Sequence, residues 1–92
     1  MKESDAFVRA IARGFSVLEA LGSPPWRHTL AETATITGLN RATVRRVLAT
    51  LVALNYCEAD GRYFRLRPRT LRIGLSYLNT LPFWPHAQSV LQ

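Results

Sequence analysis

Cysteine is nearly absent from this chain of 92 residues, and its scarcity excludes several kinds of structure and chemistry. The single cysteine, Cys57, cannot form an internal disulfide and provides no basis for a zinc site. Neither His28 nor His86 has a serine, cysteine or carboxylate at the spacing of a catalytic triad or a metal site. We therefore expect no enzymatic activity, no metal and no cofactor. Cys57 is interpreted as a small buried residue of a reducing, cytoplasmic protein.

Long apolar runs are also missing. No stretch approaches the ~20 apolar residues that cross a bilayer, and the N-terminal sequence MKESDAF lacks the apolar segment of a signal peptide. Hydrophobic residues still make up 48% of the chain, which favours a folded structure over disorder. A chain of this length forms one domain at most, near the lower limit for a hydrophobic core of its own.

Acidic residues are scarce in one part of the chain. Residues 41–72 contain eight arginines but only Glu58 and Asp60, whereas the charges outside this window cancel. The net charge of +6 therefore lies in one segment. Guanidinium groups offer a planar fork of donors to phosphate oxygens, although a basic face can also serve solubility alone. The eight arginines stand at positions 41, 45, 46, 62, 65, 67, 69 and 72.

The spacing of apolar residues predicts a first amphipathic helix from about Asp5 to Leu21. Its apolar face is predicted to consist of Phe7, Ile11, Phe15, Leu18 and Leu21. A second, shorter helix is predicted over residues 30–37, because Thr29 and Glu32 have the spacing of a capping box. Gly38 follows the last turn, where a left-handed residue commonly ends a helix.

A third helix is predicted to begin after Asn40, a favoured N-cap residue, and to run over residues 41–54. Only Gly38, Leu39 and Asn40 separate it from the second helix, and Leu39 is expected to fill the angle between the two. Two short helices joined in this way form a helix-turn-helix.

A hairpin is predicted over residues 57–66, with Asp60-Gly61 as its two-residue turn. Phe64 and Leu66 share the inward face, which leaves Tyr63 and Arg65 outward. Pro68 ends the second strand, and a fourth helix is predicted from about Arg69. Its main apolar stripe is Leu71, Leu75 and Leu78, with a smaller face at Ile73 and Tyr77.

The third helix has a buried stripe and an arginine-bearing opposite face. When Val44, Val47, Leu48 and Leu51 face inward, Arg46 lies between Ala42 and Ala49 on the outer side. Arginine can donate two bonds to guanine, threonine can bond a base or a phosphate, and alanine can contact the thymine methyl group. The predicted base-reading residues are Arg41, Ala42, Thr43, Arg45 and Arg46. The predicted phosphate or wing contacts are Thr29, Thr50, Arg62 and Arg65.

The run TLAETATITGLNRATVRRVLATLVALNYCEADGRYFRLRPRTLRIG resembles the winged helix-turn-helix domain of the IclR family of bacterial transcriptional regulators. The resemblance implies a mostly α fold with a small β-hairpin wing over residues 1–80. It also implies sequence-specific duplex DNA binding, with the third helix in the major groove and the wing on the backbone or minor groove. Residues 81–92 would begin a linker helix to an effector-binding domain that this chain does not contain.

The segment SYLNTLPFWPHAQSVLQ is similar to the linker in family members that regulate aromatic-acid catabolism, of the protocatechuate and hydroxybenzoate types. Its apolar residues Phe83, Trp84, Val90 and Leu91 are expected to need a partner surface, so we expect a homodimer or higher oligomer. Such a dimer would read a pseudo-palindromic operator. The small-molecule effector would bind the domain that is absent here.

Two other functions remain open at this point. A winged helix can act as a protein-interaction or dimerisation module without sequence-specific DNA binding, but the arginines of the third helix argue against an apolar docking face. An RNA-binding domain would usually expose several aromatic rings for base stacking, and only Tyr63 is so placed. The operator sequence, the effector, and the choice between activation and repression are not encoded in any recognisable feature.

Overall fold

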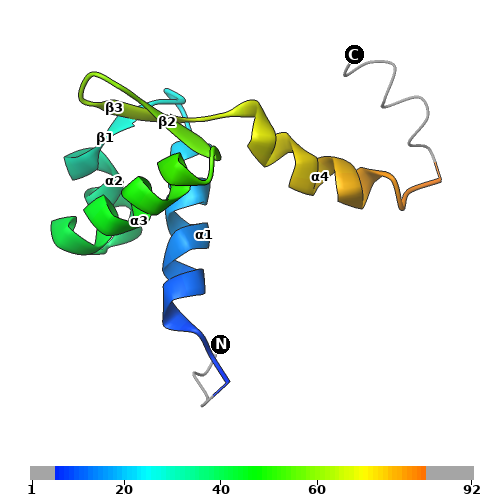
Figure 1. The fold of residues 1–92 in the computed structure, drawn as a ribbon, viewed down its shortest axis with the longest axis horizontal. Helices are drawn as coiled ribbons and strands as arrows, with labels where there is room; N and C mark the ends of the chain where they lie inside the picture. Colours follow the sequence, from blue (N-terminus) through cyan, green and yellow to red (C-terminus); the bar gives the residue numbers. More distant parts are fainter. Residues whose placement is uncertain (1–5, 83–92) are drawn as a thin grey trace.

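The computed structural model describes residues 6–82 of the chain. Three helices pack around one core, a small sheet lies against them, and a fourth helix extends away from this body (Figure 1). The elements in chain order are α1 (Arg9–Leu21), β1 (His28–Thr29), α2 (Leu30–Thr37), α3 (Arg41–Ala53), β2 (Cys57–Asp60), β3 (Tyr63–Leu66), the 3-10 turn η1 (Pro68–Thr70) and α4 (Leu71–Leu78). The predicted winged helix-turn-helix is confirmed.

Side-chain caps define the helix-turn-helix, as the sequence predicts. The Glu32 amide donates to Thr29 Oγ1 at 3.1 Å, and the Thr29 amide donates to Glu32 Oε1 at 2.8 Å. Gly38 ends α2 in the left-handed conformation, with φ of 75°. Asn40 Oδ1 then accepts from the Thr43 amide at 2.8 Å and begins α3. Leu39, half-buried in the turn, packs against the core.

The core lies where α1, α2 and α3 meet the sheet. Val17, Leu21, Val44 and Leu48 are at most 1% exposed. The inward stripe predicted for α3 is confirmed, although Val47 is only half-buried. Val17 and Leu21 lie one turn apart on α1, as Val44 and Leu48 do on α3, and all four belong to one buried cluster. Packing of these side chains determines how α3 crosses α1.

The apolar face predicted for α1 is wrong in its first half. Ile11 is 57% exposed and Phe15 is 53% exposed, while the buried positions are Val17, Ala20 and Leu21. The reason is that α1 turns toward α3 the side that carries Gly14, Val17 and Leu21, whereas Ile11 and Phe15 lie on another side of the helix. The helix also begins at Arg9 rather than Asp5, and Val8 provides no side-chain cap.

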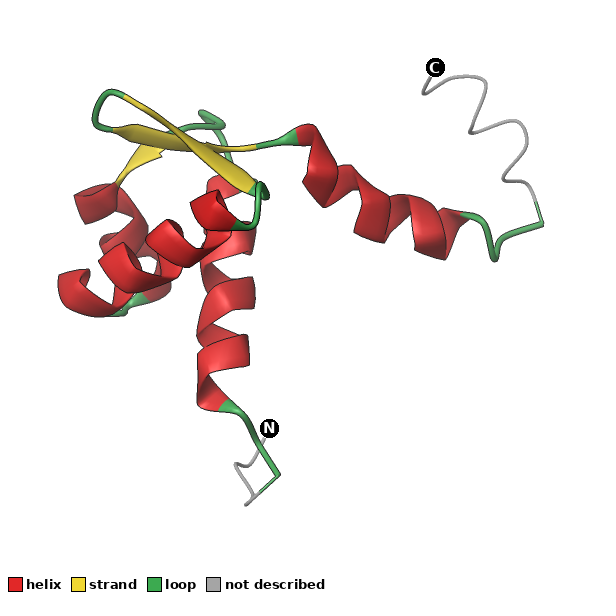
Figure 2. Ribbon diagram, in the orientation of Figure 1, coloured by secondary structure: helices red, strands yellow, loops and turns green. Residues whose placement is uncertain are grey.

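The sheet has three antiparallel strands in the order β1-β3-β2 (Figure 2). The predicted hairpin is present, but its turn is one residue later than expected, because Asp60 pairs with Tyr63. The turn residues are therefore Gly61 and Arg62. Gly61 has a φ of 63°, which suits glycine at the first position of a tight hairpin turn. As a result, Arg62 lies at the tip of the wing rather than in a strand.

Helix α4 begins two residues later than predicted, after η1, and it stands apart from the core (Figure 2). No residue of this described helix is buried, and Leu71, Ile73 and Tyr77 are each more than half exposed. None of the helices in residues 6–82 is long and apolar enough to cross a membrane. The prediction for Phe83, Trp84, Val90 and Leu91 lies outside the described residues.

Candidate nucleic-acid interface

The outer face of α3 is exposed as the helical wheel predicts. Arg41, Ala42, Arg45 and Arg46 are exposed, and Thr43 is half-buried at the edge of this face. Within residues 6–82, no carboxylate lies within ion-pair distance of any arginine of α3. These guanidinium groups are therefore available to an external anion or to a hydrogen-bond acceptor on a base edge.

The two helix N-termini of the helix-turn-helix differ in charge. Helix α3 has no acidic residue in its first turn, so its positive dipole end is unopposed and carries Arg41. Helix α2 has Glu32 in its first turn, and a backbone hydrogen bond from Thr29 lowers the pKa of that carboxyl. An anionic carboxylate at Thr29 opposes a phosphate there, so Thr29 is a weaker candidate than Arg41.

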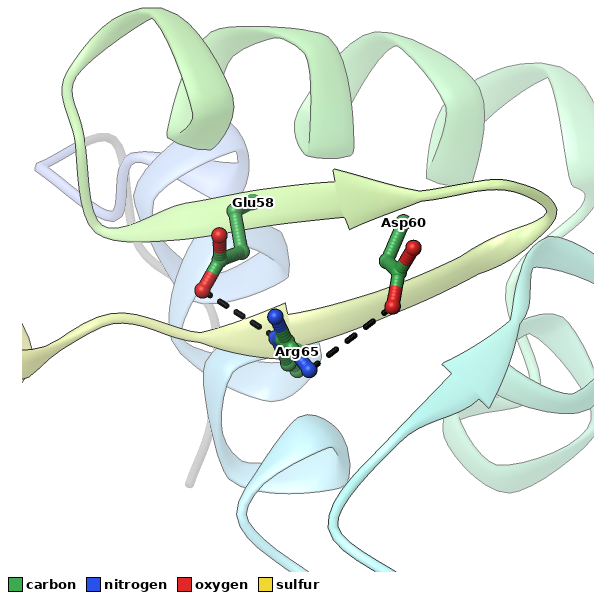
Figure 3. A network of polar contacts seen from close by, with 3 residues as sticks. All are labelled: Glu58, Asp60 and Arg65. Carbon is green, nitrogen blue, oxygen red and sulfur yellow. Dashed lines mark hydrogen bonds and ion pairs between the residues drawn. The ribbon is translucent and has the colours of Figure 1, made fainter.

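Arg65, predicted as a wing contact, lies beside two carboxylates on the outer side of the hairpin (Figure 3). Its Nε is 3.1 Å from Glu58 Oε1, and its Nη1 is 3.7 Å from Asp60 Oδ2. The side chains of Arg65 and Glu58 are 48% and 40% exposed, so solvent screens the pairs. The carboxylates nevertheless reduce the positive charge that Arg65 presents to a phosphate.

A second set of contacts lies at the tip of the wing. The Arg62 guanidinium carbon is 5.3 Å from the centre of the Tyr63 ring, and Nη2 lies 3.4 Å from the Tyr63 hydroxyl. The guanidinium carbon of Arg27 lies 4.3 Å from the same centre. Tyr63 therefore holds two cations near the wing tip through cation–π contacts.

Arg27 was not among the residues predicted from the sequence. It is brought to Tyr63 by β1, whose Thr29 pairs with Tyr63 and whose His28 pairs with Phe64. A strand of two residues is too short to give an alternating pattern, so no sequence signal placed Arg27 beside the wing.

Thr50, the other predicted phosphate contact, is exposed, and its hydroxyl donates to the Arg46 carbonyl oxygen at 3.0 Å. A bond from Thr50 to phosphate requires rotation of that hydroxyl away from the helix carbonyl.

Cys57 is 1% exposed, as expected for a small core residue. Burial raises the pKa of its thiol to about 11, which keeps it neutral at physiological pH. Among the residues that the structure describes, no three His, Cys, Asp or Glu side chains come together as a possible metal site.

Comparison with known proteins matches residues 10–61 to the model of the IclR helix-turn-helix domain. The chain is 38% identical over 85 residues to the Pca regulon regulatory protein of Pseudomonas putida, a match that covers 92% of this chain and 29% of that protein. It is 42% identical over 72 residues to the Pca operon regulatory protein of Acinetobacter baylyi, covering 78% of this chain and 26% of that protein.

The fold is similar to the crystal structure of an IclR family transcriptional regulator from Brucella abortus, with a TM-score of 0.82 and 34% identity. That match covers 100% of this chain and 36% of the Brucella chain. A regulator from Alicyclobacillus acidocaldarius gives a TM-score of 0.75 at 28% identity, over 90% of this chain and 34% of that one. The chain thus spans about a third of these relatives. The domain match, the identities and the winged fold agree: this chain belongs to the IclR family of helix-turn-helix transcriptional regulators.

Proposed function

We propose that the chain binds duplex DNA in a sequence-specific way, with α3 in the major groove. The observation that carries this proposal is the outer face of α3, where exposed arginines alternate with small alanines and Thr43. Within residues 6–82, these arginines form no ion pair with a carboxylate. Alanines let the helix approach the base edges, and arginine can bond both acceptors of guanine. Arg41, Ala42, Thr43, Arg45 and Arg46 are the proposed base-reading residues.

The wing supplies contacts to the backbone or the minor groove. Arg62 is the main candidate because it lies at the wing tip and has no carboxylate within ion-pair distance among the described residues. Such contacts add salt-dependent affinity and little sequence information. We rank three further contacts below Arg62: Thr29, Thr50 and Arg65. Thr29 lies beside the Glu32 carboxylate, and Arg65 lies beside the Glu58 carboxylate. The Thr50 hydroxyl already donates to the Arg46 carbonyl oxygen.

The active form is a homodimer on a pseudo-palindromic operator, since one helix-turn-helix reads only a half-site. Exposed apolar residues on α4, which leaves the core, support association of two copies. We propose that this domain works in the cytoplasm with an effector-binding domain of a longer regulator. A third relative, the p-hydroxybenzoate hydroxylase transcriptional activator of Acinetobacter baylyi, is 36% identical over 88 residues, and its name favours genes of aromatic-acid catabolism as the target.

The test is selection of bound sites from random duplex DNA by the 92-residue chain, followed by a salt titration with the selected duplex, single strands and duplex RNA. Enrichment of one half-site motif, with affinity that falls steeply as salt rises, supports the proposal. No enrichment, or equal affinity for all three nucleic acids, would instead favour a protein-interaction module or a nonspecific binder.

A further inference from the structure

A groove of about 250 Å³ separates the N-terminal half of α1 from α3. Figure 1 shows that this half of α1 (blue) runs beyond α3 (green), so the angle between the two helices is open. The apolar part of the groove is formed by small or branched residues such as Ala10, Gly14 and Val47, and the polar part includes Arg13, Thr43 and Arg46. The groove therefore borders the proposed base-reading face.

Among the described residues, three polar side chains of the groove have no partner, whereas the hydroxyl of a fourth, Thr50, donates to the Arg46 carbonyl oxygen. Within residues 6–82, the guanidinium groups of Arg13 and Arg46 form no hydrogen bond or ion pair, and the Thr43 hydroxyl has no hydrogen bond. In the part of the chain that the structure describes, no acidic side chain lines the groove. Two free guanidinium groups and a free hydroxyl around one concave surface make an electropositive site with donors for an anion.

Gly14 adds to the open volume of the groove. Glycine in the middle of a helix is destabilising relative to alanine, and a Cβ at this position would meet no atom within 4 Å. Nothing in the described fold requires a glycine there. The missing side chain instead leaves room beside Arg13 for something that approaches from outside.

We propose that this groove binds one sugar-phosphate unit of the DNA strand that borders the major groove occupied by α3. Arg13 donates to the phosphate, and the deoxyribose lies against Ala10, Gly14 and Val47. Arg46, at the boundary, remains free to read a base. Arg13 is thus a DNA-positioning residue on α1, outside both the reading helix and the wing. This inference rests on the proposed function, because it requires α3 to enter the major groove.

The experiment uses a duplex carrying the selected half-site, so that dimerisation does not affect the result. Affinities are measured for the parent chain and for Arg13→Ala, with Arg72→Ala on α4 as a matched loss of one arginine. Each phosphate around the half-site is replaced in turn by a neutral methylphosphonate. Log affinity falls with log salt by a slope of about 0.9 for each phosphate contact. Between about 1 M and 0.15 M salt, one phosphate contact therefore raises the affinity about fivefold.

The expected result is one methylphosphonate position that weakens the parent about fivefold and leaves Arg13→Ala unaffected. Arg72→Ala should retain the parent's sensitivity at that position, and base preference should be unchanged in Arg13→Ala. Equal sensitivity of parent and Arg13→Ala at every phosphate would overturn the groove proposal while leaving sequence-specific binding intact. Failure of the parent to bind any selected duplex would overturn both.

Steric variants give a second test that does not remove charge. Gly14→Met should fill the groove and weaken half-site binding severalfold, whereas Gly74→Met on α4 should not, although its Cβ also meets nothing within 4 Å. Circular dichroism should show that both variants fold. An NMR titration with inorganic phosphate tests whether the groove binds a phosphate that is not part of DNA. If phosphate binds at Arg13 while Gly14→Met and Arg13→Ala bind DNA like the parent, the groove serves a free phosphate ligand and the DNA assignment is wrong.

Discussion

Arg65 donates a hydrogen bond from Nε to Glu58 Oε1 at 3.1 Å, across the two strands of the wing. The pair joins residues that lie opposite each other in the register of β2 and β3. Asp60 adds a second carboxylate at 3.7 Å. The wing therefore presents a partly neutralised arginine on its outer side and, near its tip, arginines that form no ion pair within residues 6–82. The two kinds should differ in their importance for DNA binding.

We predict that Arg62→Ala weakens binding to all duplexes alike and lowers the salt slope by ~1, as expected for the loss of one phosphate contact. Arg65→Ala should lower the slope by less, because Glu58 and Asp60 already offset its charge. Fluorescence anisotropy at several salt concentrations measures both slopes. A larger loss for Arg65→Ala than for Arg62→Ala would contradict this ranking.

A companion prediction concerns Glu58→Gln, which keeps the size of the side chain and removes its charge. Arg65 should then present more positive charge, so affinity for random and selected duplexes should rise together. The same anisotropy assay applies. An unchanged or weakened affinity would mean that Glu58 holds Arg65 in its DNA-binding position and that the negative charge of Glu58 does not weaken DNA binding.

Arg46→Ala is predicted to cost ~1–3 kcal/mol on the selected site and to relax the preference at one base pair. The reason is that an arginine in the centre of the exposed face can bond both acceptors of one guanine. Site selection repeated with the variant measures the change. If Arg46→Ala weakened random and selected DNA to the same extent, Arg46 would be a phosphate contact instead.

Asn40→Ala should act through stability, because Asn40 Oδ1 accepts from the Thr43 amide at 2.8 Å and caps α3. The loss of this cap is expected to reduce the unfolding free energy by ~1 kcal/mol. Asn40→Asp, which retains a capping oxygen, is the control in urea denaturation. The effect on DNA affinity should be modest and independent of sequence, so a changed base preference would reveal a direct contact to a base.

The sequence predicted the features that depend on short-range spacing. The capping box of Thr29 and Glu32, the N-cap at Asn40 and the buried stripe of α3 each involve residues a few positions apart on one helix. Their geometry follows from the helix itself, whatever surrounds it. This is why the outer face of α3, with Arg46 in its centre, was correctly placed.

The features that were missed depend on which elements meet in space. Phe15 has helical spacing to Ile11 and Leu18, yet it is exposed because α1 turns the side with Gly14 and Val17, not the side with Phe15, toward α3. The turn moved by one residue because the pairing of Asp60 with Tyr63 decides the register. Arg13 reaches the groove because α1 crosses α3, and Arg27 reaches Tyr63 because β1 pairs with β3, and no local pattern indicated either position.

The thiol of Cys57 should resist reagents in the folded protein, because it is buried and its pKa is raised to about 11. At pH 8, reaction with a disulfide reagent should be slow and should accelerate when urea unfolds the chain. The pKa of this thiol is higher in the folded chain than in the unfolded chain, so burial of the neutral thiol contributes stability below the unfolded pKa. That contribution is lost as the pH rises toward about 11. Unfolding free energy should therefore fall between pH ~9 and ~11, and this fall should be smaller in Cys57→Ala.

The last prediction concerns α4, whose exposed Ile73 and Tyr77 lie four residues apart on one side of the helix. An apolar pair on a helix that leaves the core suits a contact with a second copy of the chain. Replacing both with serine should leave the core intact, because none of its buried residues comes from α4. Sedimentation should show a shift toward monomer, and binding to a full pseudo-palindromic site should lose cooperativity while binding to a half-site stays unchanged. A double variant that sediments and binds the full site like the parent would place the dimer contact elsewhere, with the exposed Ile11 and Phe15 of α1 as the next residues to replace.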